Sequence, residues 1–355
     1  MIHLLLLGKK KNRGGKKMNN VGIMGLGVYI PDNYIYADEI ARRTDIPQWV
    51  IEEKFGILKK PIPGPNDTTS YMGIQAAKDA INDAGIDPKE IDLVIWNGAQ
   101  HKDYPCWLAS LYVAYEIGAI NAWGFDMEAM CGSMMTGLET AKSLMLNNES
   151  LKTVLIVSGY RNCDLINYEV KDTSFMFDLG AGGVAVILRK NLNKNVVLES
   201  SFKGDGSFSE QCVIEVGGTK KWPMESEDTQ KYYFTVRDSE KFKSNLNEKT
   251  MPNFYWVIRD SLKKSGYSEK DIGYLAILHF KRSAHKAVLE ELGLNENQTT
   301  YLEDYGHLGQ NDQILSMKLA LKEGKLKDGD IAVLVGAGLG FVWAATTVKW
   351  GRIDS

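Results

Sequence analysis

Patterns typical of helices and of strands alternate along most of the chain. Short apolar runs at residues 93–96, 154–157 and 331–335 have the length of buried strands. Longer segments, such as the one that follows Cys131, place apolar residues three and four positions apart, which is typical of helices packed on a core. This alternation predicts an α/β fold in which helices cover sheets of buried strands.

The pattern of the first half of the chain recurs in the second half. Gly85 and Gly266 lie 181 residues apart, and each ends a helical pattern and leads through a short charged turn into an apolar strand. The strands that begin at Val154 and Ile331 also follow helical patterns, and they lie 177 residues apart. One such pair can arise by chance in an α/β protein, but two pairs at nearly the same separation indicate an internal duplication.

The duplication divides the chain into two halves. We expect residues 18–195 to form an N-terminal half and residues 196–355 a C-terminal half, each a mixed sheet covered by helices and packed against its twin. The polar segment 199–250 lacks clear periodicity and predicts a loop-rich connection. Residues 1–17 begin with an apolar run followed by a basic stretch, the reverse of a secretory signal. We expect them to be an extension outside the fold, with Met18 as a candidate start.

Composition and charge argue against several classes of function. The 355-residue chain has a formal net charge of −3, whereas nucleic-acid binding requires a basic surface, and no apolar run has the length of a membrane span. The four cysteines include no CxxC pair, and the five histidines form no HxxxH or HExxH pattern. Neither a disulfide framework nor a zinc site is therefore predicted, and we expect a cytoplasmic protein with reduced thiols.

Cys131 is the strongest candidate for a nucleophile. It lies in the turn that starts the helical pattern of residues 133–146, where free backbone amides and the positive end of the helix dipole favour a thiolate. Its small neighbours Gly132 and Ser133 leave room for a substrate carbonyl. The alternative is that Cys131 is a small buried apolar residue, which is the usual role of a free cysteine.

Two histidines occupy positions where α/β proteins place ligands. His279 follows an apolar strand at residues 274–278, and ligands of such sheets bind at the carboxyl ends of the strands. His307 lies in a turn before another helical pattern, 176 residues after Cys131, which is close to the separation of the repeat. A structural role is the more common one for a single histidine, but the duplication would bring the turns of Cys131 and His307 to one interface.

Three glycine-rich segments, at residues 22–27, 180–183 and 336–340, resemble parts of nucleotide-binding loops. In none of them does a helix follow the glycines, and that context is the one that phosphate binding requires. The three segments therefore predict tight turns with close backbone approach, and a nicotinamide cofactor is not expected.

The candidate residues lie in segments that resemble the β-ketoacyl-ACP synthase III group of the thiolase superfamily. The segment around Cys131 is similar to the nucleophile turn of that group, residues 278–280 to its Pro-His-Gln segment, and residues 305–307 to its His-Gly-Asn segment. Residues 178–182 and 338–343 are similar to its Gly-Asp-Gly-Ala-Gly and Gly-Gly-Gly-Phe-Thr-Trp segments. The resemblance covers about residues 20–350 and implies a duplicated αβαβα layered sandwich with two pseudo-symmetric halves.

The resemblance implies a condensing acyltransferase. Cys131 would attack an acyl thioester and carry the acyl group, while the backbone amides of Cys131 and Leu339 would form the oxyanion hole. His279 and His307 would assist decarboxylation of a malonyl-type thioester, whose enolate then attacks the acyl-enzyme. The group usually has asparagine in place of His307, so acyl transfer to a hydroxyl or amine in specialised metabolism is the alternative. A third reading is a non-catalytic partner subunit, against which the retained cysteine and histidines argue.

The resemblance also implies where the acyl carrier binds. Trp49 is similar to the tryptophan that stacks on the adenine of CoA, and Lys54 and Arg282 lie near basic positions of the entrance. Tyr104 is similar to the aromatic residue that one subunit of a homodimer places at the acyl pocket of its partner. We expect acyl-CoA and malonyl-CoA or malonyl-ACP as substrates, with acyl carrier protein and a second copy of the chain as partners. No cofactor, nucleic acid or membrane is expected, and Glu128, an acid near the nucleophile, is more simply a solvated or salt-bridged residue than a catalytic one.

Overall fold

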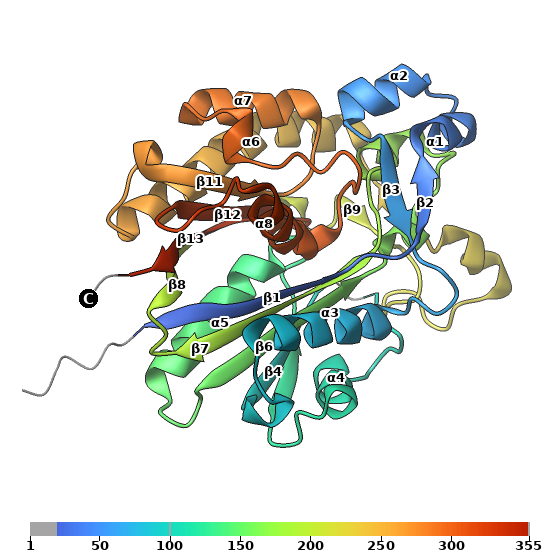
Figure 1. Ribbon diagram of the computed structural model, residues 1–355. Coiled ribbons are helices and arrows are strands. Elements are labelled where there is room, and N and C mark those ends of the chain that lie inside the picture. The colour runs from blue at the N-terminus through green and yellow to red at the C-terminus, as the bar shows by residue number, and fades with distance from the viewer. Residues whose placement is uncertain (1–19, 99–100, 354–355) are drawn as a thin grey trace, which may run out of the picture.

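The computed structural model describes residues 20–98 and 101–353, and its centre is a nine-stranded sheet (Figure 1). In order across the sheet, the strands are β11 (Ile272–Ile277), β12 (Ile331–Gly338), β13 (Val342–Arg352), β8 (Lys194–Gly204), β1 (Val21–Tyr29), β7 (Gly182–Lys190), β6 (Thr153–Tyr160), β4 (Leu93–Asn97) and β5 (Trp123–Met127). Two short pairs lie outside it, β2 (Asn33–Tyr36) with β3 (Lys59–Ile62) and β9 (Cys212–Val213) with β10 (Thr235–Val236).

The two halves of the sheet repeat one topology. The strand order is β1-β7-β6-β4-β5 in the N-terminal half and β8-β13-β12-β11 in the C-terminal half. In each half the first strand pairs antiparallel with the last, and the two that follow across the sheet pair in parallel, β4 with β6 and β11 with β12. Thr299 bridges Leu275 of β11 in parallel, at the place that β5 takes beside β4. Since β1 and β8 pair and join the halves, the predicted duplicated α/β sandwich is confirmed.

Helices form the outer and middle layers (Figure 1). The N-terminal half is covered by α3 (Thr69–Ala84) and α4 (Ala109–Ile117), and the C-terminal half by α6 (Ser239–Lys264) and α7 (Arg282–Leu292). Between the halves lie α5 (Ser133–Asn147) and α8 (Asp312–Glu323), which bury Met134, Leu138, Ile314 and Met317 against strands of both halves. The helices α1 (Ala37–Thr44) and α2 (Gln48–Val50) precede a π-helical turn, η1 (Ile51–Phe55), which contacts α7.

The ends of several elements agree with the sequence patterns, and others do not. Gly85 and Gly266 follow α3 and α6 with positive φ angles of 63° and 83°, as the predicted helix ends require. The predicted segment of loops, however, is shorter than 199–250, because β8 continues to Gly204 and α6 begins at Ser239. Pro252 lies inside α6 and is a sequence sign of a helix break, which explains the error.

Two further expectations concern the limits of the fold. The predicted extension at residues 1–17 lies outside the described residues, and the proposed division after residue 195 falls just inside β8. Within residues 20–98 and 101–353, no helix combines the length and the apolar character needed to cross a membrane.

Candidate active site

Cys131 lies in a tight turn between β5 and α5. The turn is held by the buried Ser133, whose hydroxyl accepts a hydrogen bond from the Ala129 amide (2.7 Å) and donates one to the Met130 carbonyl (2.6 Å). Met130 has a φ angle of 49°, a conformation that residues other than glycine rarely adopt and that is found at functional sites. The structure thus places the partly exposed thiol of Cys131 directly before the first turn of α5, as predicted.

His307 is the histidine that meets this thiol. Its backbone amide donates to the Asp178 carbonyl (2.8 Å), its Nδ1 lies 2.6 Å from Asp312 Oδ2, and its ring hydrogen-bonds Cys131. Burial by itself would lower the pKa of His307. Attraction to Asp312 and Cys131, with hydrogen bonds to both, outweighs burial and raises this pKa well above the ordinary value. His307 therefore favours its protonated form beside the Cys131 sulfur.

His279 has a different environment. Its side chain is completely buried, with Nδ1 2.9 Å from Asp178 Oδ2 and Nε2 3.1 Å from the Gly56 carbonyl oxygen. A carbonyl oxygen only accepts hydrogen bonds, so Nε2 is the donor in that contact. Because both ring nitrogens are engaged by protein groups, His279 offers neither of them to Cys131 in this conformation.

The turn between β12 and β13 lies against the nucleophile turn. A methyl group added at Gly338 would lie 2.3 Å from the Ala129 carbonyl oxygen and 3.1 Å from the Cys131 nitrogen, so only glycine permits this approach. Leu339, the next residue, is partly buried. The amides of Cys131 and Leu339 thus belong to adjoining turns, which is consistent with their predicted use as an oxyanion hole.

The sequence patterns did not predict that Asp178, Asp312 and Tyr160 lie beside the histidines of the site. Asp178 and Asp312 each contact a histidine, and the Tyr160 ring lies 6.4 Å from the His307 ring. Burial and the nearby Cys131 raise the pKa of Tyr160 well above its ordinary value, so it stays neutral. Two signals were available: Asp178 begins the segment similar to Gly-Asp-Gly-Ala-Gly, and Asp312 follows His307 by five residues at the start of a helical pattern.

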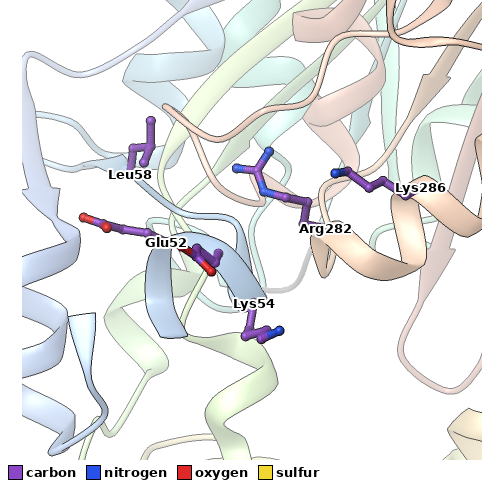
Figure 2. A pocket seen from close by; sticks show the side chains of 6 residues that line it. Glu52, Lys54, Leu58, Arg282 and Lys286 are labelled. Carbon is purple, nitrogen blue, oxygen red and sulfur yellow. The ribbon is translucent and has the colours of Figure 1, made fainter. Parts of the chain in front are cut away.

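A cleft of about 550 Å³ opens between η1 and α7 (Figure 2). The residues that line it are Glu52, Glu53, Lys54, Leu58, Arg282 and Lys286. The structure therefore brings two predicted binding residues, Lys54 and Arg282, to one opening, with the Arg282 guanidinium paired to Glu303. Arg282 also begins α7, while Gly56, the next residue after η1, contacts the buried His279, so the η1 segment that borders the cleft leads directly to this histidine.

The other predicted binding residues lie outside this cleft. Trp49, in α2, precedes η1 and is 54% exposed, so its ring is accessible to a ligand. Tyr104 is 65% exposed and packs edge-on against Trp107 at 5.6 Å, away from the cleft. Glu128 is exposed. In the part of the chain that the structure describes, no three His, Cys, Asp or Glu side chains are arranged to hold a metal ion.

Both halves of the chain match proteins of one family. Sequence models of 3-oxoacyl-[acyl-carrier-protein (ACP)] synthase III match residues 125–206, and of its C-terminal part residues 262–350. The β-ketoacyl-ACP synthase III 1 of Bacillus anthracis is 26% identical over 339 residues, covering 94% of this chain and all of the relative. The β-ketoacyl-ACP synthase III of Desulfitobacterium hafniense is 28% identical over 339 residues, covering 94% of this chain and 99% of that protein.

Solved structures share the fold. The 3-oxoacyl-ACP synthase III of Pseudomonas aeruginosa superposes with a TM-score of 0.81 at 21% identity, covering 95% of this chain and all of that one. The priming β-ketosynthase of the R1128 polyketide pathway gives a TM-score of 0.81 at 22% identity, covering 94% of this chain and 97% of that one. From the matches in both halves of the chain and the shared fold, we conclude that this protein belongs to the 3-oxoacyl-ACP synthase III family of thiolase-like condensing acyltransferases.

Proposed function

We propose that this protein condenses an acyl group carried on Cys131 with a malonyl-type thioester, releasing carbon dioxide. The observation that carries the proposal is the contact between Cys131, at the start of α5, and a His307 that holds its proton. A thiolate paired with an imidazolium is the reactive form of a cysteine nucleophile. Family membership favours condensation over the alternative of acyl transfer to a hydroxyl or amine.

Acylation of the enzyme uses both groups. The Cys131 sulfur forms a bond to the thioester carbonyl carbon, and the bond from that carbon to the carrier sulfur breaks. The departing carrier thiolate takes the proton from His307, and the carbonyl oxygen is stabilised by the amides of Cys131 and Leu339. In the second half-reaction, loss of carbon dioxide from the extender leaves an enolate that attacks the acyl carbon and releases the Cys131 thiolate. His307 then takes up a proton from water, which restores the starting state. His279 stays a predicted participant, whose ring would first have to leave the Gly56 carbonyl.

The acyl carrier would enter over the cleft between η1 and α7. Lys54, Arg282 and Lys286 supply cationic groups at the cleft, and CoA and acyl carrier protein both present phosphates to an entrance of this kind. The exposed ring of Trp49 is available to stack on an adenine. The names of the relatives point to acyl carrier protein as the carrier of the extender.

We propose further that the working form is a homodimer built on the β5 edge of the sheet. Within residues 20–98 and 101–353, β5 is the last strand of the sheet, and one row of its backbone groups has no neighbouring strand. Exposed large apolar side chains gather on β5, on α4 and on the segments beside them, namely Tyr104, Leu108, Leu111, Tyr112, Tyr115, Ile120 and Trp123. An apolar surface beside a free strand edge fits a second copy of the same chain, related by a two-fold axis.

Release of labelled carbon dioxide from a carboxyl-labelled malonyl thioester tests the condensation. We expect release that depends on one acyl-CoA of a panel and that is lost in Cys131→Ala. The matched control is Cys212→Ala, because burial raises the pKa of the Cys212 thiol to about 12 and leaves it unreactive. An acyl adduct on Cys131 without carbon dioxide release would instead favour acyl transfer, and absence of any adduct would favour a non-catalytic subunit.

A further inference from the structure

Asp312 links the two histidine segments of the site. Its side chain is completely buried at the first position of α8 and accepts hydrogen bonds from three donors. The His279 amide (2.7 Å) and His307 Nδ1 (2.6 Å) reach Oδ2, and the Leu308 amide (2.7 Å) reaches Oδ1. A buried carboxylate with this set of donors has a fixed orientation, and it fixes the orientation of the imidazole that it contacts.

The contact with Asp312 also settles which nitrogen of His307 faces the nucleophile. Because Nδ1 faces Asp312 Oδ2, the ring nitrogen that hydrogen-bonds Cys131 is Nε2. A carboxylate accepts and does not donate, so Nδ1 carries a proton whenever Asp312 is ionised. Nε2 is then free to exchange a proton with the Cys131 sulfur or with a leaving thiolate.

We propose that Asp312 is a positioning residue that completes a Cys131–His307–Asp312 triad and holds His307 in the protonated form that pairs with the Cys131 thiolate. The role of this triad in turnover rests on the function proposed above. The contacts among the three residues are present in the protein without substrate. In this chain a single imidazole, supported by a carboxylate, therefore serves the nucleophile, while His279 is held by Asp178 and the Gly56 carbonyl.

Other charged and titratable groups near His307 do not replace Asp312. Asp178 directs its carboxylate to His279 and gives His307 only its backbone carbonyl. The Lys60 ammonium donates to the carbonyls of Phe177 (2.6 Å) and Leu179 (2.7 Å). Tyr160, whose ring lies 6.4 Å from the His307 ring, stays neutral for the reasons given above. Asp312 is thus the one carboxylate among these groups that contacts the His307 ring.

The rate of Cys131 alkylation by iodoacetamide as a function of pH tests the triad without any turnover. Peptide mass spectrometry should follow Cys131 alone, because Cys106 is also exposed. In Asp312→Asn we expect the rate at pH 6 to fall by at least about tenfold relative to the unaltered protein and the two rates to agree within about threefold at pH 9.5, as thiolate forms at higher pH without its imidazolium partner. A uniform loss at all pH values, or no change, would overturn the proposal.

Two further variants separate positioning from a general effect on the site. Asp178→Asn removes the carboxylate on the other histidine and should leave the pH profile of Cys131 in place, so an equal shift would contradict the assignment. In a His307→Asn background, Asp312→Asn should cause no additional shift, because Asp312 acts through His307. An additional shift there would show that Asp312 acts on the thiol by another route.

A measurement on the unaltered protein covers the case in which Asp312→Asn does not fold. Nuclear magnetic resonance of ring-labelled histidine should show His307 protonated on both nitrogens through pH 7 and beyond. Titration of His307 near pH 6.5 would overturn the triad even if carbon dioxide release had established the condensation. Conversely, an intact triad in a protein without condensing activity would leave this inference standing and remove only the proposed function.

Discussion

His285 is a buried histidine that the chemistry does not use. It lies on α7 with 5% of its surface exposed, and neither ring nitrogen has a hydrogen-bond partner among the residues that the structure describes. The Tyr301 ring packs against it at 4.9 Å. Burial, followed by the neighbouring His279 and Arg282, lowers the pKa of His285 to about 4. The native protein therefore keeps this imidazole neutral in a pH range in which the unfolded chain protonates it.

This residue makes a defined contribution to acid sensitivity. Between pH 6.5 and pH 4 the unfolded state binds a proton at position 285 that the native state does not, so the free energy of unfolding falls as the pH falls through this window. At about 1.4 kcal/mol per pH unit, the loss attributable to His285 amounts to about 3 kcal/mol. Urea unfolding at a series of pH values should show this slope reduced in His285→Phe.

The control for this prediction is Val288, a buried apolar residue of the same helix. Val288→Ala removes no titratable group, so it should keep the slope of the unaltered protein between pH 6.5 and pH 4. If His285→Phe kept that slope as well, His285 would not be the source of the acid sensitivity.

At the scale of elements, α3 lies unusually close to the sheet because three strands present glycine beneath it. A methyl group would lie 1.9 Å from the Ala76 carbonyl oxygen at Gly27, 2.3 Å from the Met72 carbonyl oxygen at Gly183, and 1.9 Å from the Thr69 carbonyl oxygen at Gly159. No Cβ atom is tolerated at such distances from backbone atoms. The close contact packs α3 against β1, β6 and β7 and buries the apolar core between them.

Substitution of one of these glycines should therefore displace the helix. We expect Gly159→Ala to lower the free energy of unfolding by about 3 kcal/mol, since the backbone of α3 has to move to admit the methyl group. Gly206→Ala is the matched control, because a methyl group there meets no atom of the described part of the chain within 4 Å. Urea denaturation compares the two, and equal stability of both variants would argue against close packing of α3.

At the scale of the whole molecule, the apolar surface around β5 is the feature that a single copy leaves exposed. Tyr115 is 78% exposed and Trp123 is 50% exposed, on neighbouring parts of the same edge. Burial of such side chains by a second copy removes apolar area from water, at about 25 cal/mol per Å². The proposed homodimer would cover this edge.

The homodimer can be tested directly by light scattering after size exclusion. We expect the unaltered protein to have the mass of two chains and Tyr115→Asp to have the mass of one at micromolar concentration, because a carboxylate would be buried without a partner at the interface. Trp256→Asp, at an exposed tryptophan of α6, should keep the dimer. A monomeric unaltered protein would rule out the β5 interface.

Much of the fold could be predicted because it depends on local patterns. Buried strands, amphipathic helices and glycines at helix ends each have a sequence pattern only a few residues long. The recurrence of these patterns in the second half of the chain indicated the duplicated sandwich. The helical pattern of residues 133–146 likewise predicted that Cys131 lies directly before a helix. The separation of the repeat placed His307 opposite Cys131, and the structure shows the two in contact.

The sequence by itself therefore determined the layered fold, the nucleophile turn and the segments that supply the histidines. Only the tertiary structure decided which histidine reaches the thiol and which acid supports each ring. His279 is held by Gly56, 223 residues away in the chain, and by Asp178, 101 residues away. Such long-range hydrogen bonds produce no periodic pattern in the sequence. They form because packing of the two halves buries polar groups, and a buried polar group without a hydrogen bond is costly.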